Sequence, residues 1–155
     1  MIEGERITLR PIRMDDLERC TRWVQDPEVI RHVIQETKTA EEERAWLHHV
    51  ISNPHDHIFM IEITEGNIPI GNCGIHERST DPALQNEEGV SVGIMIGEKE
   101  YWGKGYGAEA ISLLAGYARE NLLVSRVWLT VDIVHDRAIK AYMNAGFSVV
   151  RELKV

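Results

Sequence analysis

The sequence predicts an α/β fold in which one mixed β-sheet carries helices packed against it. Three observations favour this fold. Strand-like and helix-like segments alternate along the 155 residues without a repeat, a low-complexity tract or a linker. A turn with three glycines joins a strand-like segment directly to a helix-like one. A β-branched run, a short helix and a further strand-like segment then complete the chain. We therefore expect a single domain over residues 1–155.

Strand-like patterns account for four segments before residue 98. In residues 6–12, the side chains of Ile7, Leu9 and Pro11 alternate with those of Thr8, Arg10 and Ile12. Because Pro11 has no N–H donor for a ladder, we expect an edge-type strand. Residues 57–63 and 68–77 flank the turn sequence TEGN and predict a β-hairpin. A polar loop then leads to an apolar strand at 89–97.

Two helices are expected between the first strand and the hairpin. Residues 14–26 have apolar side chains at helical spacing, with Asp15 and Asp16 near the start, where acids favour the helix dipole. Residues 39–53 begin at Thr39, which can cap a helix whose first turn is filled with acids. The apolar face of this second helix is expected to contain Trp46, His49 and Val50.

The last third of the chain predicts helix, strand, helix and strand in that order. Residues 108–122 have the stripe of an amphipathic helix. Residues 125–134 are an almost unbroken β-branched and aromatic run, which is typical of a strand buried on both faces. Residues 135–146 predict a short helix that Gly146 ends as a C-terminal cap. Residues 147–153 then close the fold as a strand.

The formal net charge of −8 is distributed unevenly. Residues 1–100 carry 10 Lys and Arg against 20 Asp and Glu, whereas residues 101–155 carry 7 against 5. We expect no nucleic-acid partner, because binding to nucleic acid depends on neutralising phosphates. The acidic part suits a cationic partner such as an amine, or it serves only to solubilise the surface.

Compartment and metal content are also constrained by the residues. No apolar run approaches the roughly 20 residues of a membrane span, and charges interrupt the start of the chain, so neither a span nor a signal peptide is expected. Cys20 and Cys73 are far apart and outside a CxxC pattern, which predicts two reduced thiols in a cytoplasmic protein. His48 and His49 are adjacent and cannot face one way on a helix, so no metal site is expected.

The glycine turn has the properties of an anion site. Gly103, Gly105 and Gly107 stand just before good helix formers, although each glycine costs about 0.5–1 kcal/mol relative to alanine in regular structure. Main-chain N–H groups at a helix N-terminus attract anions, and missing side chains let a pyrophosphate approach. Lys104 lies between the glycines, so the turn fits neither the nucleoside-triphosphate loop nor the dinucleotide fingerprint. The alternative is a merely tight strand-to-helix turn.

Residues 88–147 resemble the GNAT superfamily of acetyl-CoA-dependent N-acetyltransferases. The resemblance rests on VSVGIMIGEKEYWGKGYGAEAI and VWLTVDIVHDRAIKAYMNAGF, and within the superfamily it is closest to the branch of ribosomal-protein alanine and spermidine acetyltransferases. It implies a mostly antiparallel sheet that is splayed at the acetyl-CoA site, with helices on both faces. Relatives usually continue with one more strand after the last residues, so the last strand is expected to be missing, or a partner subunit in a homodimer supplies it.

The resemblance also implies how acetyl-CoA is held as cosubstrate. The family's pyrophosphate loop corresponds to Trp102, Gly103, Lys104, Gly105, Tyr106 and Gly107, with Ala108 next in place of a frequent Thr. Main-chain N–H groups of residues 103–108 are expected to hold the pyrophosphate. Pantetheine is expected along Met95 and Ile96, where that strand splays from residues 127–134. His135 stands where the family commonly has Asn and is expected to contact pantetheine, with a titration near pH 6.5.

The resemblance implies that Tyr142 is the general acid for the departing thiolate. A phenol can donate this proton without ionising at neutral pH, and the alternative is a core tyrosine on an amphipathic helix. The base stays open. Where the branch often has an acid this chain has Ser91, while Glu87 and Glu88 through water, or His76, are alternatives.

We therefore expect direct attack of a primary amine on acetyl-CoA in one ternary complex. At pH 7, deprotonation of a lysine-like amine costs about 4.6 kcal/mol and that of an α-amine about 1.4 kcal/mol, so the first needs a base more. The acceptor is a small molecule or a peptide: a protein N-terminus, a polyamine, an aminoglycoside-like compound or a small amino compound. The alternative function is a non-catalytic acyl-CoA-binding regulatory module.

Overall fold

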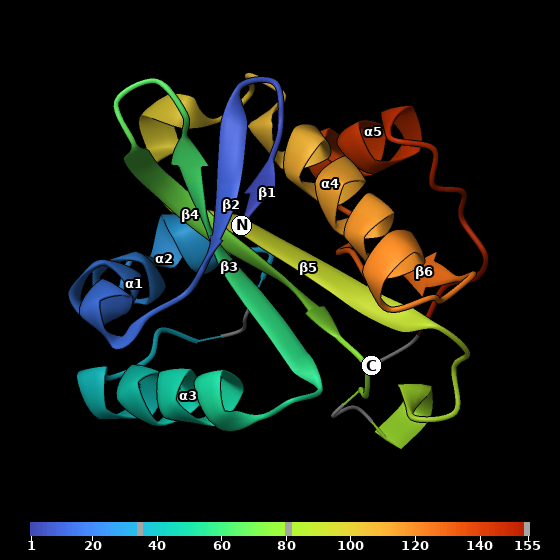
Figure 1. Cartoon of the computed structure of the whole chain (residues 1–155), viewed down its shortest axis with the longest axis horizontal. Coiled ribbons are helices and arrows are strands. Elements are labelled where there is room, and N and C mark those ends of the chain that lie inside the picture. The colour runs from blue at the N-terminus through green and yellow to red at the C-terminus, as the bar shows by residue number, and fades with distance from the viewer. Residues whose placement is uncertain (34–35, 80–81, 154–155) are drawn as a thin grey trace.

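The computed structural model describes residues 1–33, 36–79 and 82–153 (Figure 1). Its centre is a six-stranded sheet in the order β1-β2-β3-β4-β5-β6. Neighbouring strands are antiparallel except for β5 and β6, which run parallel. The strands are β1 (Ile2–Glu3), β2 (Ile7–Pro11), β3 (Asp56–Ile63), β4 (Ile68–His76), β5 (Val90–Ile96) and β6 (Val127–Trp128).

Helices cover both faces of this sheet. In Figure 1, α1, α2 and α3 lie on the left of the sheet and α4 and α5 on the right. Their bounds are α1 (Leu17–Val24), α2 (Pro27–Ile30), α3 (Ala40–Ser52), α4 (Tyr106–Asn121) and α5 (Asp136–Asn144). Three short 3₁₀ turns accompany them, η1 (Met14–Asp16), η2 (Pro82–Leu84) and η3 (Lys99–Tyr101). The mixed, mostly antiparallel sheet with helices on both faces confirms the expected fold class.

The core is divided between these two faces. The α4-side core consists of Ile7, Leu9, Phe59, Ile61, Ile70, Cys73, Ile75, Val90, Val92, Ala110, Ile111, Leu114 and Ala118. The α1-side core consists of Ile12, Cys20, Trp23, Val24, Val29, Ile30, Leu47, Val50, Ile58, Met60 and Met95. Strand β5 contributes to both, because successive side chains of a strand point to opposite faces. Val92 packs toward α4 and Met95 toward α1.

Several local predictions are confirmed by the ladder and the caps. Strands β3 and β4 form the predicted hairpin around a turn in which Gly66 and Asn67 have positive φ. Thr39 caps α3 in a reciprocal capping box with Glu42. Gly146 follows α5 with φ of 101°, as a C-terminal cap requires.

Two local predictions in the first half of the chain are wrong. The strand at 6–12 is not an edge, because β1 pairs outside it through Ile2 opposite Leu9. A two-residue strand carries too little periodicity to be seen in the sequence. Of the expected face of α3, Val50 is buried as predicted, but His49 is exposed and Trp46 is half-buried, and the buried face consists of Glu43, Leu47 and Val50.

The strand expected at 125–134 is also much shorter than its composition predicts. Only Val127 and Trp128 pair with β5, opposite Val90 and Ser91. Beyond that point β5 continues to Ile96 while its β6 side has no ladder partner in the described chain. The two segments therefore splay apart, as the family resemblance implies.

The closing strand expected at 147–153 does not form in the described residues. Its side chains Val149 and Val150 are 72% and 71% exposed. A β-branched run becomes a strand only where a neighbour completes its ladder, and the residues that follow β6 offer no extended partner.

Candidate active site

The glycine turn follows β5 and starts α4. Gly103 and Gly105 have φ of 74° and 84°, a left-handed conformation that glycine adopts without strain. Gly105 is the N-cap of α4. A Cβ atom at Gly107 would lie 3.3 Å from the Ile94 side chain, a tight contact with β5. The N–H groups of the first turn, Tyr106 to Ala108, have no intrahelical acceptor and carry the positive end of the helix dipole.

A clamp at the other side of the turn joins it to the start of β2. The Glu109 carboxylate accepts hydrogen bonds from the main-chain N–H groups of Arg6 at 2.8 Å and Ile7 at 3.2 Å, and from Arg6 Nε at 2.9 Å. Arg6 Nη1 donates to the Lys104 carbonyl at 2.8 Å, and the guanidinium lies 4.4 Å over the Tyr106 ring. Burial raises the pKa of Glu109, but these hydrogen bonds outweigh burial and lower it overall. Sequence reasoning missed this clamp, since Arg6 and Glu109 are 103 residues apart.

Trp102 connects the turn to the end of β5. Its indole Nε1 donates to the Ile96 carbonyl at 2.8 Å. The Arg137 guanidinium of α5 lies 4.9 Å from the centre of the Trp102 ring. The expected phosphate-loop side chain Lys104 turns toward Tyr101, with Nζ 5.7 Å from that ring. The Trp102 side chain thus contacts β5 and α5, whereas the exposed Lys104 ammonium lies near Tyr101.

Strand β5 presents one unpaired edge. Its ladder to β4 runs from His76 opposite Ser91 to Gly71 opposite Ile96, whereas its ladder to β6 stops at Ser91. Met95 is 7% exposed and packs into the α1-side core, and Ile96 packs against the α4-side core. Trp128 stands at the last paired position of β6, and its indole nitrogen is buried with no hydrogen-bond partner in the described structure.

The start of α5 faces the segment that follows α2. The His135 ring stacks on His32 with centroids 4.2 Å apart, and His32 Nδ1 lies 3.0 Å from Asp132 Oδ2. Burial and the neighbouring His32 lower the pKa of His135 below its ordinary value. Any titration of His135 therefore lies below pH 6.5, because the neutral ring is favoured.

Tyr142 lies on α5 and packs against the α4-side core. Its ring is 6.5 Å from that of Phe147, in an edge-on arrangement. Burial raises the pKa of the phenol. The side chain is thus both packed as a core tyrosine packs and protonated as a general acid must be.

A cavity of about 270 Å³ opens on the α1 face of the sheet and reaches the middle of β5. Its sheet side is lined by Ile58, Asn72, Cys73, Gly74, His76, Gly93, Ile94 and Met95. Its opposite side is lined by Val24 of α1, by Glu43 and Trp46 of α3, and by Val33 and Lys38, which lie between α2 and α3 in the chain. A Cβ atom at Gly93 would meet nothing within 4 Å, so the wall is open at this position of β5.

Of the three groups left open as bases, His76 is the one that lines this cavity. His76 Nδ1 lies 2.7 Å from Asp56 Oδ1. Glu87 forms ion pairs with Arg151 and Arg126, and the bond from Arg151 lowers its pKa. Glu88 is exposed, and neither glutamate is among the described residues around the cavity.

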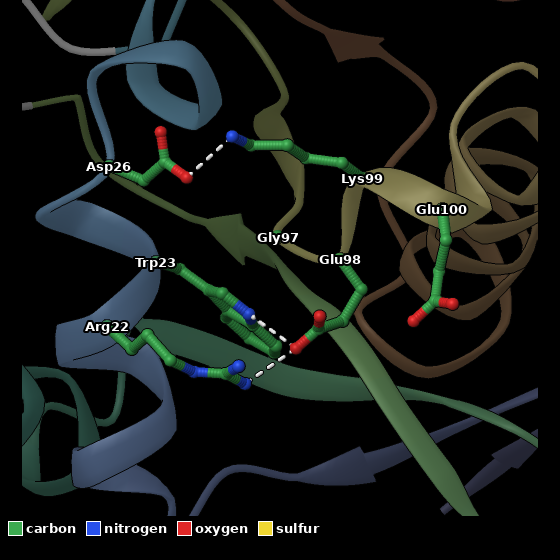
Figure 2. A pocket seen from close by; sticks show the side chains of 7 residues that line it. All are labelled: Arg22, Trp23, Asp26, Gly97, Glu98, Lys99 and Glu100. Carbon is green, nitrogen blue, oxygen red and sulfur yellow. Dashed lines mark hydrogen bonds and ion pairs between the residues drawn. The ribbon is translucent and has the colours of Figure 1, made fainter.

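A second pocket of about 310 Å³ lies where α1 meets the end of β5 (Figure 2). Figure 2 shows Arg22 and Trp23 pointing at the Glu98 carboxylate, at 2.6 and 3.0 Å, and Lys99 reaching Asp26 at 2.8 Å. These charged groups pair with one another, and their contacts join α1 and the start of α2 to the segment between β5 and the glycine turn. Nothing in the sequence indicated it.

Across residues 1–33, 36–79 and 82–153, no group of three or more His, Cys, Asp or Glu side chains is placed to hold a metal ion. In the same part of the chain, no helix combines the length and apolar character that crossing a bilayer requires.

Comparisons with known proteins agree with this geometry. The "uncharacterized N-acetyltransferase p20" of Bacillus licheniformis is 24% identical over 148 residues, covering 92% of this chain and 79% of that protein. The fold is similar to spermidine N-acetyltransferase from Vibrio cholerae in complex with CoA and spermine, with a TM-score of 0.82, 19% identity and coverage of 97% and 85%. It is also similar to aminoglycoside acetyltransferase AAC(6')-Ib in complex with coenzyme A, with a TM-score of 0.79, 18% identity and coverage of 92% and 84%. Residues 6–148 match the family described as acetyltransferase (GNAT) domain. The chain therefore belongs to the GNAT acetyltransferase family.

Proposed function

We propose that this protein transfers the acetyl group of acetyl-CoA to a primary amine in one ternary complex. The observation that carries the proposal is the cavity on the α1 face, which reaches the unpaired edge of the strand leading into the glycine turn. Each substrate thus has its own approach to the same segment of β5. Within the family, the sequence motifs favour the branch of ribosomal-protein alanine and spermidine acetyltransferases.

The residues present suit coenzyme A as a ligand. Left-handed glycines at Gly103 and Gly105 keep Cβ atoms off the turn, and the N-terminus of α4 favours a pyrophosphate. The open edge of β5 at Met95 and Ile96 suits the amide groups of pantetheine, which pair with main chain as an added strand does. The buried N–H of Trp128 is a donor available to an oxygen bound at the splay.

His76 is the proposed proton acceptor for the amine. Asp56 accepts a hydrogen bond from Nδ1–H of His76, which leaves Nε2 free to accept a proton. The arrangement resembles the base-and-orienting-carboxylate pair of other acyl-transfer sites. Nitrogen of the neutral amine attacks the thioester carbonyl, the C–N bond forms, and the amine proton passes to His76 directly or through water.

Tyr142 is the proposed proton donor for the leaving group. When the C–S bond breaks, the electron pair stays on sulfur, and the phenol proton neutralises the thiolate. Because burial raises its pKa, Tyr142 stays protonated at neutral pH. The main-chain turn at 103–108 and the side chain His135 complete the proposed binding residues for acetyl-CoA.

Release of free coenzyme A, followed with a thiol reagent across a panel of amines, tests the proposed function. We expect release that depends on both acetyl-CoA and amine. Binding of coenzyme A by calorimetry without release from any amine would instead support the regulatory acyl-CoA-binding module. The variant His76→Gln distinguishes loss of the proton acceptor from loss of the folded structure. Its rate of acetyl transfer is expected to fall at pH 7 and to recover partly at high pH, where the free amine is abundant.

A further inference from the structure

The cavity on the α1 face, which is the acceptor cavity of the proposed reaction, contains a single carboxylate among its described lining residues, that of Glu43. Glu43 lies in the first turn of α3, and its side chain is 1% exposed. The carboxylate of Asp56 is not among these lining residues, and its Oδ1 lies 2.7 Å from His76 Nδ1. Among the described lining residues, a cationic acceptor entering the cavity therefore has one carboxylate to reach.

That carboxylate is already occupied by the chain itself. Lys38 Nζ lies 2.7 Å from Glu43 Oε1, and the same ammonium lies 5.2 Å from the centre of the Trp46 ring. The main chain of Lys38 is held by a hydrogen bond from its N–H to the Val24 carbonyl at 3.2 Å. A carboxylate and an aromatic face are the two features that bind an ammonium group. Lys38 fills both.

Apart from Asn72, whose Nδ2 donates to Cys20 Sγ, and the His76 ring, the rest of the described wall offers little to a second positive charge. Val24, Val33, Ile58, Ile94 and Met95 are apolar. A further ammonium would lose its hydration without gaining a carboxylate, beside the like charge of Lys38. An alkyl or aryl group has no charge that must lose its hydration in such surroundings, and burial of its apolar surface is favourable. The excess of acids over residues 1–100 thus does not extend to this cavity.

We infer that the acceptor is a monoamine with an apolar body, and that Lys38 is an internal counter-ion of Glu43 that excludes polycationic acceptors. The inference rests on the proposed acetyl transfer and assigns its substrate class. The reacting amine enters as the neutral base toward His76, while its apolar body lies against Trp46 and the aliphatic wall. Polyamines and aminoglycosides are poor acceptors for this chain, although structurally similar proteins are named for acting on them.

A comparison of 2-phenylethylamine and hexylamine with spermidine and kanamycin tests the wild-type preference. We expect kcat/KM for the two monoamines to exceed that for the polycations at least about tenfold, as one unfavourable buried charge is enough to produce. Spermidine as the better acceptor would overturn the inference. If no amine releases thiol, the proposed function fails, and the order of amine affinities in calorimetry then decides the inference.

The variant Lys38→Met tests the role of the counter-ion. Methionine keeps an apolar stem and frees Glu43 for an external ammonium, so kcat/KM for spermidine is expected to rise about tenfold relative to hexylamine. Lys99→Met is the matched control, because Lys99 pairs with Asp26 and Glu28 outside the cavity. Unchanged selectivity in a folded Lys38→Met protein would overturn the inference.

A double variant keeps the test valid if Lys38→Met does not fold. Breaking a buried ion pair leaves an uncompensated charge, whereas replacing both partners is often tolerated. Lys38→Met with Glu43→Leu is therefore expected to fold and to show no gain in kcat/KM for spermidine relative to hexylamine. A gain on spermidine without Glu43 would contradict the assigned role of this carboxylate.

Discussion

Tyr142 can be examined as a single residue, because its two interpretations predict different kinetics. Tyr142→Phe keeps the ring that packs on the α4-side core and removes the proton donor. If Tyr142 is the general acid, kcat falls about 10²-fold or more while the KM for acetyl-CoA changes little. Steady-state kinetics with a fixed amine measure both constants. Full turnover would identify Tyr142 as a core tyrosine only.

The pH profile of the wild type gives an independent check of Tyr142. A general acid acts while protonated, and burial raises the pKa of this phenol above its ordinary value. The loss of activity caused by its ionisation is therefore expected only above about pH 10. A basic limb below that value has to come from another group.

The two cysteines allow a prediction about the reaction path. Burial raises the pKa of the Cys20 thiol to about 12, and burial raises that of Cys73 as well. Since the thiolate is the nucleophile, neither forms an acyl-cysteine at neutral pH, although Cys73 lines the cavity. We expect the native protein to resist a thiol reagent and both thiols to react in guanidinium. Mass spectrometry after incubation with acetyl-CoA alone should find no acetyl group on Cys73.

At the scale of elements, substitutions of glycine in and after the turn distinguish the effect of backbone conformation from the effect of the space available to a side chain. Gly105→Ala places a side chain at φ of 84°, with Cβ 3.3 Å from Arg6 Nη2. We expect a loss of about 1–2 kcal/mol in stability and weaker binding of coenzyme A, because the turn has to shift. Urea unfolding and calorimetry measure the two effects.

Gly116→Ala is the matched control for Gly105→Ala. Gly116 lies inside the same helix, and a Cβ atom there meets nothing within 4 Å. The substitution is expected to stabilise α4 by about 0.5–1 kcal/mol and to leave binding unchanged. Unaltered affinity for coenzyme A in Gly105→Ala would remove the turn from the proposed binding site.

The elements that the sequence predicts well are those fixed by local rules. The cap at Thr39 and the cap at Gly146 depend on neighbours a few residues away. The run at 125–134 was misinterpreted because β-branched composition is a preference, and a strand also needs a partner that only the fold supplies. For the same reason the sequence does not reveal β1, whose two residues pair with β2, the strand that was expected to be an edge.

The parts of the candidate site that could be predicted from the sequence are likewise those with local signals. The glycine turn could be predicted because positive φ and a helix start leave local signals, and the family resemblance supplied Tyr142 and His135 as expectations. Glu43 was interpreted only as one of the acids that favour a helix start, yet it is buried in the cavity. The preference for His76 over Glu87 as the proposed base required the cavity, which has His76 but not Glu87 among its described lining residues, and no spacing in the sequence encodes that.

At the scale of the whole molecule, Arg10 joins the sheet to the α1 face. It is 8% exposed in β2, and its Nε donates to Glu62 of β3 at 2.9 Å. Its Nη1 and Nη2 donate to both carboxylate oxygens of Asp16, at 2.9 and 2.8 Å, at the start of α1. Arg10 thus links strands β2 and β3 to the start of α1, the helix that contributes Val24 to the cavity.

The Asp16 carboxyl makes this connection sensitive to acid. Burial raises the pKa of Asp16, but hydrogen bonds from Arg10 and from the Arg13 N–H outweigh burial and lower it overall. A carboxyl with a lowered folded-state pKa adds stability that is complete above its unfolded value, about 3.9, and disappears as the pH falls through the folded value.

Asp16→Asn is therefore expected to destabilise the protein by about 3 kcal/mol at pH 7, because Arg10 loses a buried charged partner. Urea titrations at a series of pH values should give a constant difference from wild type down to about pH 5 and a shrinking difference below about pH 4. Asp15→Asn is the matched control on the exposed side of the same turn and should change stability by less than about 0.5 kcal/mol. A difference that persists unchanged at pH 2 would mean that Asp16 acts through packing and not through its charge.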